Sequence, residues 1–470
     1  MPGELIKKIS TYTLGEFVSK GLSAILIPVY SYLLSPAQYA DLALFNIVLA
    51  LTSIVVGLGA GTALLRFYFT LDAAAFRTMV RSLLACLLTL GAILLGISSL
   101  QADALSQSLG GLSYLGCILP ALFCGVLLGT FEQFVSALLR IREEAHAFAI
   151  MTMVSSTLKT GLIVAAVVWQ TEVSSIAWAT LAAIAIMSVY YLRYLGRFLG
   201  GETTLSRASL VAALGLSLPV VPHNLSHWIL NLSDRYLLEH NVDAEELGLY
   251  AFAFSLTWLM AALYHALNNA FAPEYGHLVR DDAPGRDALV STRIELHLML
   301  TFVVFWGAYL LLSPAIMLIA DSDYRASVSF VPWLVTGALC YGIYYPFANV
   351  VTVVVGRTRV LATASITGAV LQLTLNIWLI PRYGALAAAT NVIVGYGVLA
   401  VGVIAYSMIK TGIRVSPRTV MQFALATAAV VAIYEATIDV PLAALVALRL
   451  TAIVVLSWPL YIWFRHRVTG

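Results

Sequence analysis

The most regular feature of the sequence is the alternation of long apolar runs with short polar segments. An α-helix rises about 1.5 Å per residue, so about 20 apolar residues cross a hydrocarbon core about 30 Å thick. The runs predict fourteen transmembrane helices, at residues 9–34, 38–65, 76–100, 111–139, 147–169, 173–198, 208–238, 246–272, 290–319, 327–355, 359–380, 384–409, 417–437 and 441–464. Because the first residues lack a short apolar core followed by a small-residue cleavage site, we expect no cleaved signal peptide.

The composition is that of a polytopic membrane protein. Hydrophobic residues make up 61% of the chain and charged residues 11%, whereas a soluble domain is about 25% charged. No polar segment is long enough to form a soluble catalytic domain, and the phosphate-binding pattern GxxxxGK[ST] does not occur. The four cysteines fall in apolar runs, so neither disulfides nor a metal site is expected. The sequence therefore predicts an all-α membrane protein that does not hydrolyse ATP.

Lysine and arginine are distributed unevenly over the predicted loops. With the N-terminus in the cytoplasm, the inner loops hold twenty of the 26 basic residues, and the outer loops hold only Arg325 and Arg382. Cytoplasmic loops of membrane proteins carry such an excess. We therefore expect both termini in the cytoplasm.

A weak internal repeat divides the chain. The segment SYLLSPAQYADLALF (31–45) aligns with RYLLEHNVDAEELGLYAFAF (235–254) after a three-residue insertion, and six predicted helices separate the two copies. An even number of helices gives both copies the same direction through the membrane. The repeat predicts two parallel six-helix lobes, at 1–200 and 201–410, followed by two additional helices at 411–470. In transporters built this way the substrate site lies between the lobes, near mid-membrane.

Two charged residues lie inside the first predicted helix. Glu16 and Lys20 share one helical face with Ser23. A charge near the bilayer centre costs at least about 2.5 kcal/mol unless it faces protein or water. We expect this face to line a hydrated cavity, where Lys20 contacts an anionic substrate and Glu16 is its resting partner or a proton carrier. An ion pair that only fixes the helix is the alternative.

The seventh span is the most polar. His223, His227, Asn231 and Asp234 follow the spacing i, i+4, i+8 and i+11, which places them on one face. The two histidines have metal-ligand spacing, but no third ligand is evident nearby. Hydrogen bonding to a substrate or to water in a cavity is therefore the expected role of this stripe, and a protonation switch at the histidines stays open.

Bends in the first helix of each lobe would suit helices that move during gating. Pro28 in the first span and Pro222 in the seventh each remove a backbone donor. Asp234 and Arg235, near the outer end of the seventh span, favour a salt bridge or cap slightly over ligand binding. The residues assigned to gating or ion coupling are Glu16, Pro28, Pro222, Asp234 and Arg235.

Other polar residues add to these two helices. His265 and Asn268 lie in the eighth span, and Arg66 lies at the inner end of the second, where a basic residue also attracts an anion. Lys159 in the fifth span is expected to extend to the cytoplasmic interface. The residues assigned to substrate contact are Lys20, Glu16, Arg66, His223, His227, Asn231, His265 and Asn268.

Three glycine pairs have the spacing GxxxG. They are Gly57/Gly61, Gly125/Gly129 and Gly196/Gly200. This spacing is typical of helices that pack closely in a membrane.

Three segments together resemble one family. TYTLGEFVSKGLSAILIPVYSYLLSPAQYADLALF with LGAGTALLRFYF, then NLSDRYLLEH followed by LGLYAFAF, and LQLTLNIWLIPRYGALAAATNVIVGYG are similar in order and spacing to polysaccharide flippases of the Wzx type. These belong to the multidrug/oligosaccharidyl-lipid/polysaccharide exporter superfamily. Asp41 stands where glycine is commoner in the family, and Ala385 and Ala387 stand in a segment that is usually Gly-Ala-Ala.

The resemblance implies a V-shaped bundle that moves undecaprenyl-pyrophosphate-linked oligosaccharide from the cytoplasmic to the periplasmic leaflet of a bacterial inner membrane, for O-antigen or exopolysaccharide. It implies no enzyme activity and no cofactor, and leaves coupling to H⁺, Na⁺ or the membrane potential open. Implied partners are the lipid-linked oligosaccharide, membrane lipids and the polymerase machinery, without nucleic acid. One alternative is a drug or organic-cation antiporter of the same superfamily, which would require a cavity rich in acidic and poor in basic residues. The other is a membrane glycosyltransferase or polymerase, which would require a large outer loop with catalytic acids or arginines.

Overall fold

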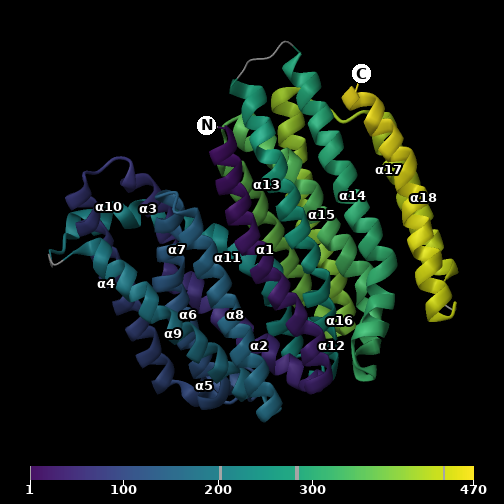
Figure 1. Ribbon diagram of the computed structural model, residues 1–470. Helices are drawn as coiled ribbons and strands as arrows, with labels where there is room; N and C mark the ends of the chain where they lie inside the picture. Colours follow the sequence, from purple (N-terminus) through teal and green to yellow (C-terminus); the bar gives the residue numbers. More distant parts are fainter. Residues whose placement is uncertain (1, 201–203, 281–284, 438–439, 470) are drawn as a thin grey trace. The chain divides into compact units, whose positions relative to one another are not determined.

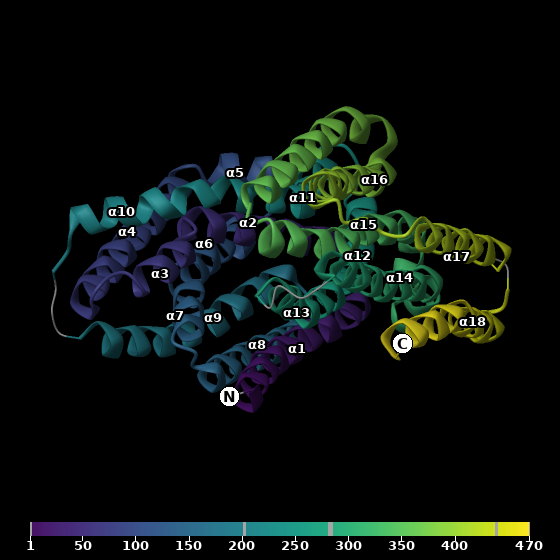
Figure 2. The same ribbon diagram turned by 90° about the horizontal axis from the view of Figure 1, so that it is seen from above.

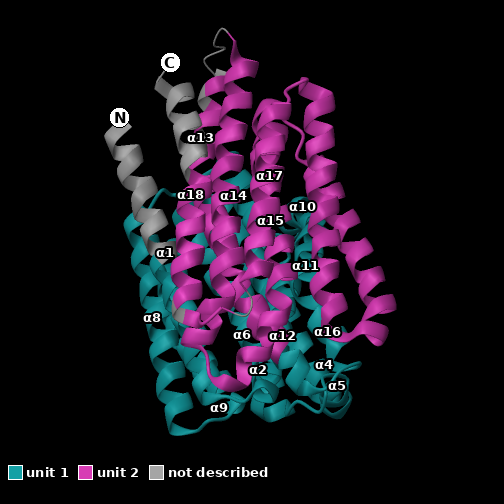
Figure 3. Ribbon diagram, turned by 90° about the vertical axis from the view of Figure 1, so that its right-hand side faces the viewer, with its two compact units in different colours: residues 1–248 teal, residues 249–470 magenta. Residues whose placement is uncertain are grey.

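The computed structural model describes residues 2–200, 204–280, 285–437 and 440–469, and their regular structure is helical throughout (Figure 1). The chain divides into two compact units, residues 1–248 and residues 249–470 (Figure 3). Helix α12 (Ala244–Thr257) runs across the boundary between them.

Unit 1 contains the first seven membrane spans, several of which consist of more than one helical segment. In chain order the segments are α1 (Pro2–Leu33), α2 (Pro36–Gly57), α3 (Ala60–Tyr68), α4 (Ala73–Leu100), α5 (Ala102–Ser108), η1 (Tyr114–Ile118), α6 (Leu119–Leu127), η2 (Leu128–Glu132), α7 (Gln133–Ile141), α8 (Ala145–Trp169), α9 (Val173–Leu199), α10 (Arg207–Ser217), η3 (Leu218–Val220) and α11 (Val221–Glu239).

The start of α2 shows how local sequence sets a helix boundary. Ser35 accepts a hydrogen bond from the backbone N–H of Gln38, while the Gln38 side chain accepts one from the backbone of Ser35. Pro36 occupies the first turn, where a backbone N–H would have no acceptor within the helix, so its absence costs no hydrogen bond. This capping box fixes the turn between the first two spans.

The second and seventh spans are interrupted where they meet. Leu58 and Gly59 have left-handed backbone angles, φ 47° and 65°, and separate α2 from α3. A side chain on Gly59 would lie 2.9 Å from the carbonyl oxygen of Ser217, next to the 3₁₀ turn η3 that interrupts the seventh span. The bend expected before the polar stripe of this span therefore occurs as a 3₁₀ turn, through which the helix continues.

Close packing between α2 and the fourth span depends on glycine. A Cβ on Gly125 would lie 2.5 Å from Cβ of Thr52, and one on Gly129 would lie 2.7 Å from the Ser53 carbonyl oxygen. A Cβ on Gly57 would lie 3.0 Å from Oε1 of Gln133. Small residues allow helix backbones to approach this closely, which confirms the packing role of these glycines. A Cβ on Gly196 or on Gly200, by contrast, would have no neighbouring atom within 4 Å.

Unit 2 contains the remaining spans. After α12 come α13 (Leu259–Arg280), α14 (Arg286–Ile319), η4 (Ser322–Phe330), α15 (Val331–Asn349), η5 (Val350–Val354), α16 (Arg359–Thr411), α17 (Pro417–Ala436) and α18 (Leu442–Thr469).

Helix α16 is a hairpin of two spans rather than one long helix (Figure 2). Gly384 has φ 58° and ψ −143°, outside the helical region and accessible mainly to glycine. The two arms then run side by side: a Cβ on Gly368 would lie 2.5 Å from the carbonyl oxygen of Gly395. Asn391 Nδ2 donates to Asn376 Oδ1 at 2.8 Å, between buried side chains. The eleventh and twelfth predicted helices are therefore confirmed as an antiparallel pair.

Helices α17 and α18 pack against α14 at the edge of unit 2 (Figure 1). Phe302 of α14 stacks on Phe423 of α17 with ring centroids 4.6 Å apart. Arg449 of α18 is buried and donates to the carbonyl oxygens of Leu310 and Tyr434, at 2.9 and 3.2 Å. A buried guanidinium needs such acceptors, so Arg449 joins α18 to both neighbours.

The described residues confirm the all-α polytopic fold with fourteen spans. Eleven helices meet length and apolarity criteria alone, one of them is the hairpin α16, and the first and last spans have shorter apolar stretches at Val18–Leu33 and Ala444–Ser457. The expected lobe limits at residues 200 and 410 stay a prediction.

Candidate functional site

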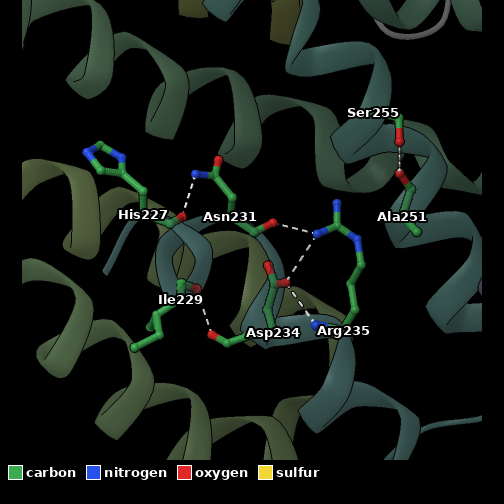
Figure 4. A network of polar contacts seen from close by, with 8 residues as sticks. His227, Ile229, Asn231, Asp234, Arg235, Ala251 and Ser255 are labelled. Carbon is green, nitrogen blue, oxygen red and sulfur yellow. Dashed lines mark hydrogen bonds and ion pairs between the residues drawn. The ribbon is translucent and has the colours of Figure 1, made fainter. Parts of the chain in front are cut away.

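The polar stripe of the seventh span lies on α11 and is held together by its own backbone (Figure 4). Asn231 Nδ2 donates to the carbonyl oxygen of His227 at 2.7 Å, and Arg235 Nη1 donates to the carbonyl oxygen of Asn231. The rings of His223 and His227 meet edge to face with centroids 4.8 Å apart. Both histidines and Asn231 are half-buried, so the structure confirms their common helical face.

Asp234 and Arg235 form the buried end of this stripe. Asp234 is 0% exposed and Arg235 is 4% exposed. Asp234 Oδ1 accepts a hydrogen bond from the Arg235 backbone N–H at 2.8 Å and lies 3.6 Å from Arg235 Nη1. Charges buried this deeply in a protein require partners of opposite sign or hydrogen bonds. Pro222, expected to bend this helix for gating, lies exposed in the first turn of α11.

The side chain of Lys20 lies on the surface of the first span. Lys20 lies in α1 and is exposed. The hydroxyl groups of Ser19 and Ser156 hydrogen-bond and join α1 to α8. Pro28 lies inside α1, which continues to Leu33. The side chain of Glu16 lies outside the described residues, so its pairing with Lys20 stays a prediction.

Arg66 lies on a different helix from the α11 stripe. It lies in the last turn of α3 and is exposed. Its carbonyl oxygen accepts a hydrogen bond from the hydroxyl of Thr70 at 3.1 Å. A basic side chain at a helix C-terminus also interacts favourably with the helix dipole, which gives Arg66 a structural role beside the expected attraction of a diphosphate.

A second polar group lies inside unit 1, between the fourth, fifth and sixth spans. The hydroxyl of Tyr191 on α9 donates to Oε2 of Glu132 at 3.1 Å. Lys159 lies in the middle of α8 and interacts electrostatically with Glu132. The expectation that Lys159 extends to the cytoplasmic interface stays a prediction, and Glu132 is an acidic group that acts on it within the span.

In unit 2, His265 and Asn268 belong to a larger group of aromatic and amide side chains. The Tyr345 hydroxyl lies 3.0 Å from Nδ1 of His265, and the Tyr341 hydroxyl lies 3.3 Å from Nε2. Asn349 Nδ2 donates to Asn268 Oδ1 at 2.9 Å. The structure thus connects the two predicted residues of α13 to α15.

Sequence reasoning missed the aromatic members of this group. Trp258, at the interruption between α12 and α13, stacks on Phe254 and on Tyr341, with centroids 5.1 and 5.6 Å away. Tyr344 stacks on Tyr341 at 6.2 Å, and Tyr396 of α16 lies 5.2 Å from Tyr341. The run YGIYY at 341–345 was the available signal. We call Trp258, His265, Asn268, Tyr341, Tyr344, Tyr345, Asn349 and Tyr396 the unit 2 aromatic cluster.

A pocket of about 330 Å³ lies elsewhere in unit 1, at the start of α2 and α9. Its described lining residues are Gln38, Asp41, Gly110, Gly111, Leu112, Ser113, Cys117, Glu172, Val173 and Ser174. None of these is a predicted site residue. In the part of the chain that the structure describes, no three side chains of the types that bind metal ions lie together.

The helix count and the intramembrane polar residues define a multi-pass membrane protein. A family model described as polysaccharide biosynthesis protein matches residues 29–329, more than half of the chain. The chain therefore belongs to this family, which confirms the resemblance seen in the sequence.

A relative and two solved structures extend the comparison. A Haemophilus influenzae protein of the Lsg locus is 23% identical over 286 residues, which cover 58% of this chain and 66% of that protein, just under two thirds. The lipid II flippase MurJ in an inward closed conformation has a similar fold, with a TM-score of 0.76, 14% identity, and coverage of 97% of this chain and 99% of that one. An inward-facing multidrug resistance MATE family transporter of the MOP superfamily follows, with a TM-score of 0.62, 17% identity, and coverage of 85% and 94%. At these identities the two structures show a shared fold.

Proposed function

We propose that this protein is a flippase that moves an undecaprenyl-pyrophosphate-linked oligosaccharide from the cytoplasmic to the periplasmic leaflet by alternating access. The observation that carries the proposal is the match to a polysaccharide biosynthesis family by a chain with a transporter fold. In this proposal the protein works in the bacterial inner membrane, with both termini in the cytoplasm, without enzyme activity or a cofactor. It acts upstream of the machinery that polymerises O-antigen or exopolysaccharide.

The pyrophosphate is the part of such a substrate that is hardest to move. An unpaired anion in hydrocarbon is strongly disfavoured, and a nearby cation lowers that barrier. Lys20 is exposed within a span and supplies this charge, while Arg66 is exposed at the end of α3 and attracts the anion first. An inside-negative membrane potential favours outward movement of anions by about 2.3 kcal/mol per charge per 100 mV.

The sugar part requires hydrogen-bonding groups and apolar ring faces. His223, His227 and Asn231 supply the hydrogen-bonding groups in unit 1, where all three are half-buried. In unit 2 the half-buried rings of Trp258 and Tyr344 supply ring faces, together with His265 and Asn268. Sites with aromatic walls and a few placed polar groups are typical of small-molecule recognition.

The test combines gene deletion with mass spectrometry of lipid extracts. The expected result is accumulation of undecaprenyl-pyrophosphate-linked oligosaccharide with loss of surface polymer. Normal lipid intermediates and polymer, with increased sensitivity to cationic drugs, would instead support the antiporter whose fold the chain shares.

The anion-binding role of Lys20 is tested by substitution in the same cells. We expect Lys20→Ala to abolish surface polymer and Lys20→Arg to retain it, because both cations can pair with a diphosphate. Lys410→Ala, at an exposed position in the last turn of α16, is the matched control and is expected to retain polymer. Full activity of Lys20→Ala at normal expression would refute the proposed anion site while leaving the flippase proposal in place.

A further inference from the structure

The group around Glu132 joins three membrane spans of unit 1. Glu132 ends the π-helical segment η2, about 14 Å of helix from the inner limit of the span at Ile141. Lys159 lies about 15 Å of helix from the opposite end of its own span at Trp169. Neither residue is near a helix end, so both ionisable groups are held at membrane depth.

The carboxylate of Glu132 is half-buried and has two kinds of partner. Tyr191 donates a hydrogen bond to it at 3.1 Å from α9, and Lys159 opposes its charge from α8. Tyr191 also hydrogen-bonds Ser155, one turn before Lys159 on the same helix, and lies beside Tyr190. On the α2 side, Gln133 next to Glu132 donates to the Ser53 hydroxyl at 2.8 Å. Among the residues that the structure describes, the ionisable groups that act on Glu132 are thus one lysine and one tyrosine.

The backbone at Glu132 departs from the α-helical pattern. The segment Leu128–Glu132 has π-helical hydrogen bonds, and Gly129 within it packs against the α2 backbone. Short π-helical segments inside α-helices are frequent at functional sites. A membrane helix that served only as a scaffold would gain nothing from an acidic residue here, because ionisable groups inside spans are costly.

We propose that Glu132 is the proton-binding residue that couples proton movement to transport, with Lys159 and Tyr191 as its positioning residues. This proposal rests on the proposed function. Glu132 gains one proton from water and forms a carboxylic acid, and it later returns that proton to water, with no other bond changed. Protonation leaves Lys159 without its opposing charge, so an anion beside Lys159 and a proton on Glu132 favour each other's binding.

The first test follows transport in cells that lack the gene and carry variants at equal membrane levels. Glu132→Gln keeps the shape and can still accept the Tyr191 hydrogen bond, but it cannot bind a proton. We expect loss of surface polysaccharide with Glu132→Gln and retention with Glu132→Asp. Glu172→Gln, an isosteric change at an exposed acid outside the spans, is the matched control and should retain it. Normal polysaccharide with Glu132→Gln would show that the carboxylate is only structural.

The second test measures proton binding directly and needs no substrate. Infrared difference spectra of the purified protein between mildly alkaline and mildly acidic pH report the C=O stretch of a newly formed carboxylic acid. We expect one such band in the wild type and after Glu172→Gln, and its loss after Glu132→Gln. Tyr191→Phe keeps the carboxyl group but removes its donor, so the pH midpoint of the band should rise; an unchanged midpoint would contradict the positioning role of Tyr191.

The two tests separate the failure of this inference from failure of the proposed function. If the infrared band of Glu132 is present but deletion of the gene leaves the polysaccharide unchanged, the proton site is retained and the flippase proposal is rejected. If the band is absent but deletion of the gene still abolishes the polysaccharide, the proton site is rejected and the flippase proposal is retained.

Discussion

Asp234 retains a carboxylate in a position that solvent does not reach. Arg235, the next residue in the chain, opposes its charge, and the two are held on α11 by the Asn231 carbonyl and the Arg235 backbone N–H. Removing one member of a buried ion pair is more damaging than replacing both, because the remaining charge stays buried without compensation. The pair therefore contributes to the integrity of the seventh span whatever its part in gating.

This reasoning predicts a stability difference at residue 234. Asp234→Ala should destabilise the protein by about 3–5 kcal/mol, the usual cost of breaking a buried pair, and lower its melting temperature in detergent. Asp323→Ala, at an exposed position of η4, should leave the melting temperature unchanged. Equal melting temperatures of the two variants would mean that the buried carboxylate contributes no net stability.

At the scale of helices, the apolar runs were sufficient to locate every span, but not the irregularities within them. The breaks at Leu58 and Trp258 and the π-helical segments η2 and η5 depend on the neighbouring helix against which the backbone packs. Gly59 illustrates this: its left-handed angle makes sense only beside the Ser217 carbonyl, about 160 residues later in the chain. A periodic pattern in one segment contains no such information.

The candidate site shows the same limit. Helical periodicity placed His223, His227 and Asn231 together because they share one helix. It could not join Trp258 to Tyr341 and Tyr396, because those rings come from the break between α12 and α13, from α15 and from α16. The hydrogen bond from Tyr191 to Glu132 was missed for the same reason.

Gly129 provides a test of helix packing. Gly129→Ala places a methyl group 2.7 Å from the Ser53 carbonyl and 3.0 Å from the Gly57 amide nitrogen, both of them backbone atoms. Overpacking of this kind costs about 1–3 kcal/mol, and a lower melting temperature in detergent is expected. Gly161→Ala on α8, where nothing lies within 4 Å, serves as the control. A stable Gly129→Ala variant would indicate that α2 can move away from η2 without cost.

For the molecule as a whole, the irregular segments recur with the period of the six-helix repeat. The second and eighth spans are both interrupted, at Leu58 and at Trp258, and the fourth and tenth both contain a π-helical segment. The first and seventh contain Pro28 and the 3₁₀ turn η3. Features six spans apart thus follow the spacing that the predicted repeat at 31–45 and 235–254 would give.

The expected cytoplasmic N-terminus, together with fourteen spans, predicts which loops are accessible from outside the cell. In a variant without the four native cysteines, Thr171→Cys and Ser322→Cys should react with a membrane-impermeant thiol reagent added to intact spheroplasts. Thr70→Cys and Thr358→Cys should react only after permeabilisation. All four positions are exposed, so accessibility depends on the side of the membrane. Labelling of Thr171→Cys and Ser322→Cys from opposite sides would require a different number of spans between them.

The reversal at Gly384 has a consequence for biogenesis. The eleventh span carries buried Gln372 and Asn376, and Asn376 finds a hydrogen-bond partner in Asn391 only after the twelfth span has been synthesised. Polar side chains reduce the tendency of a nascent helix to enter the lipid. We therefore expect ribosome-bound chains that include residues 359–411 to integrate as a helical pair, whereas chains ending at residue 383 integrate poorly in a microsomal insertion assay. Asn376→Leu should rescue the short chain, and efficient integration of the unmodified short chain would show that the eleventh span enters the bilayer alone.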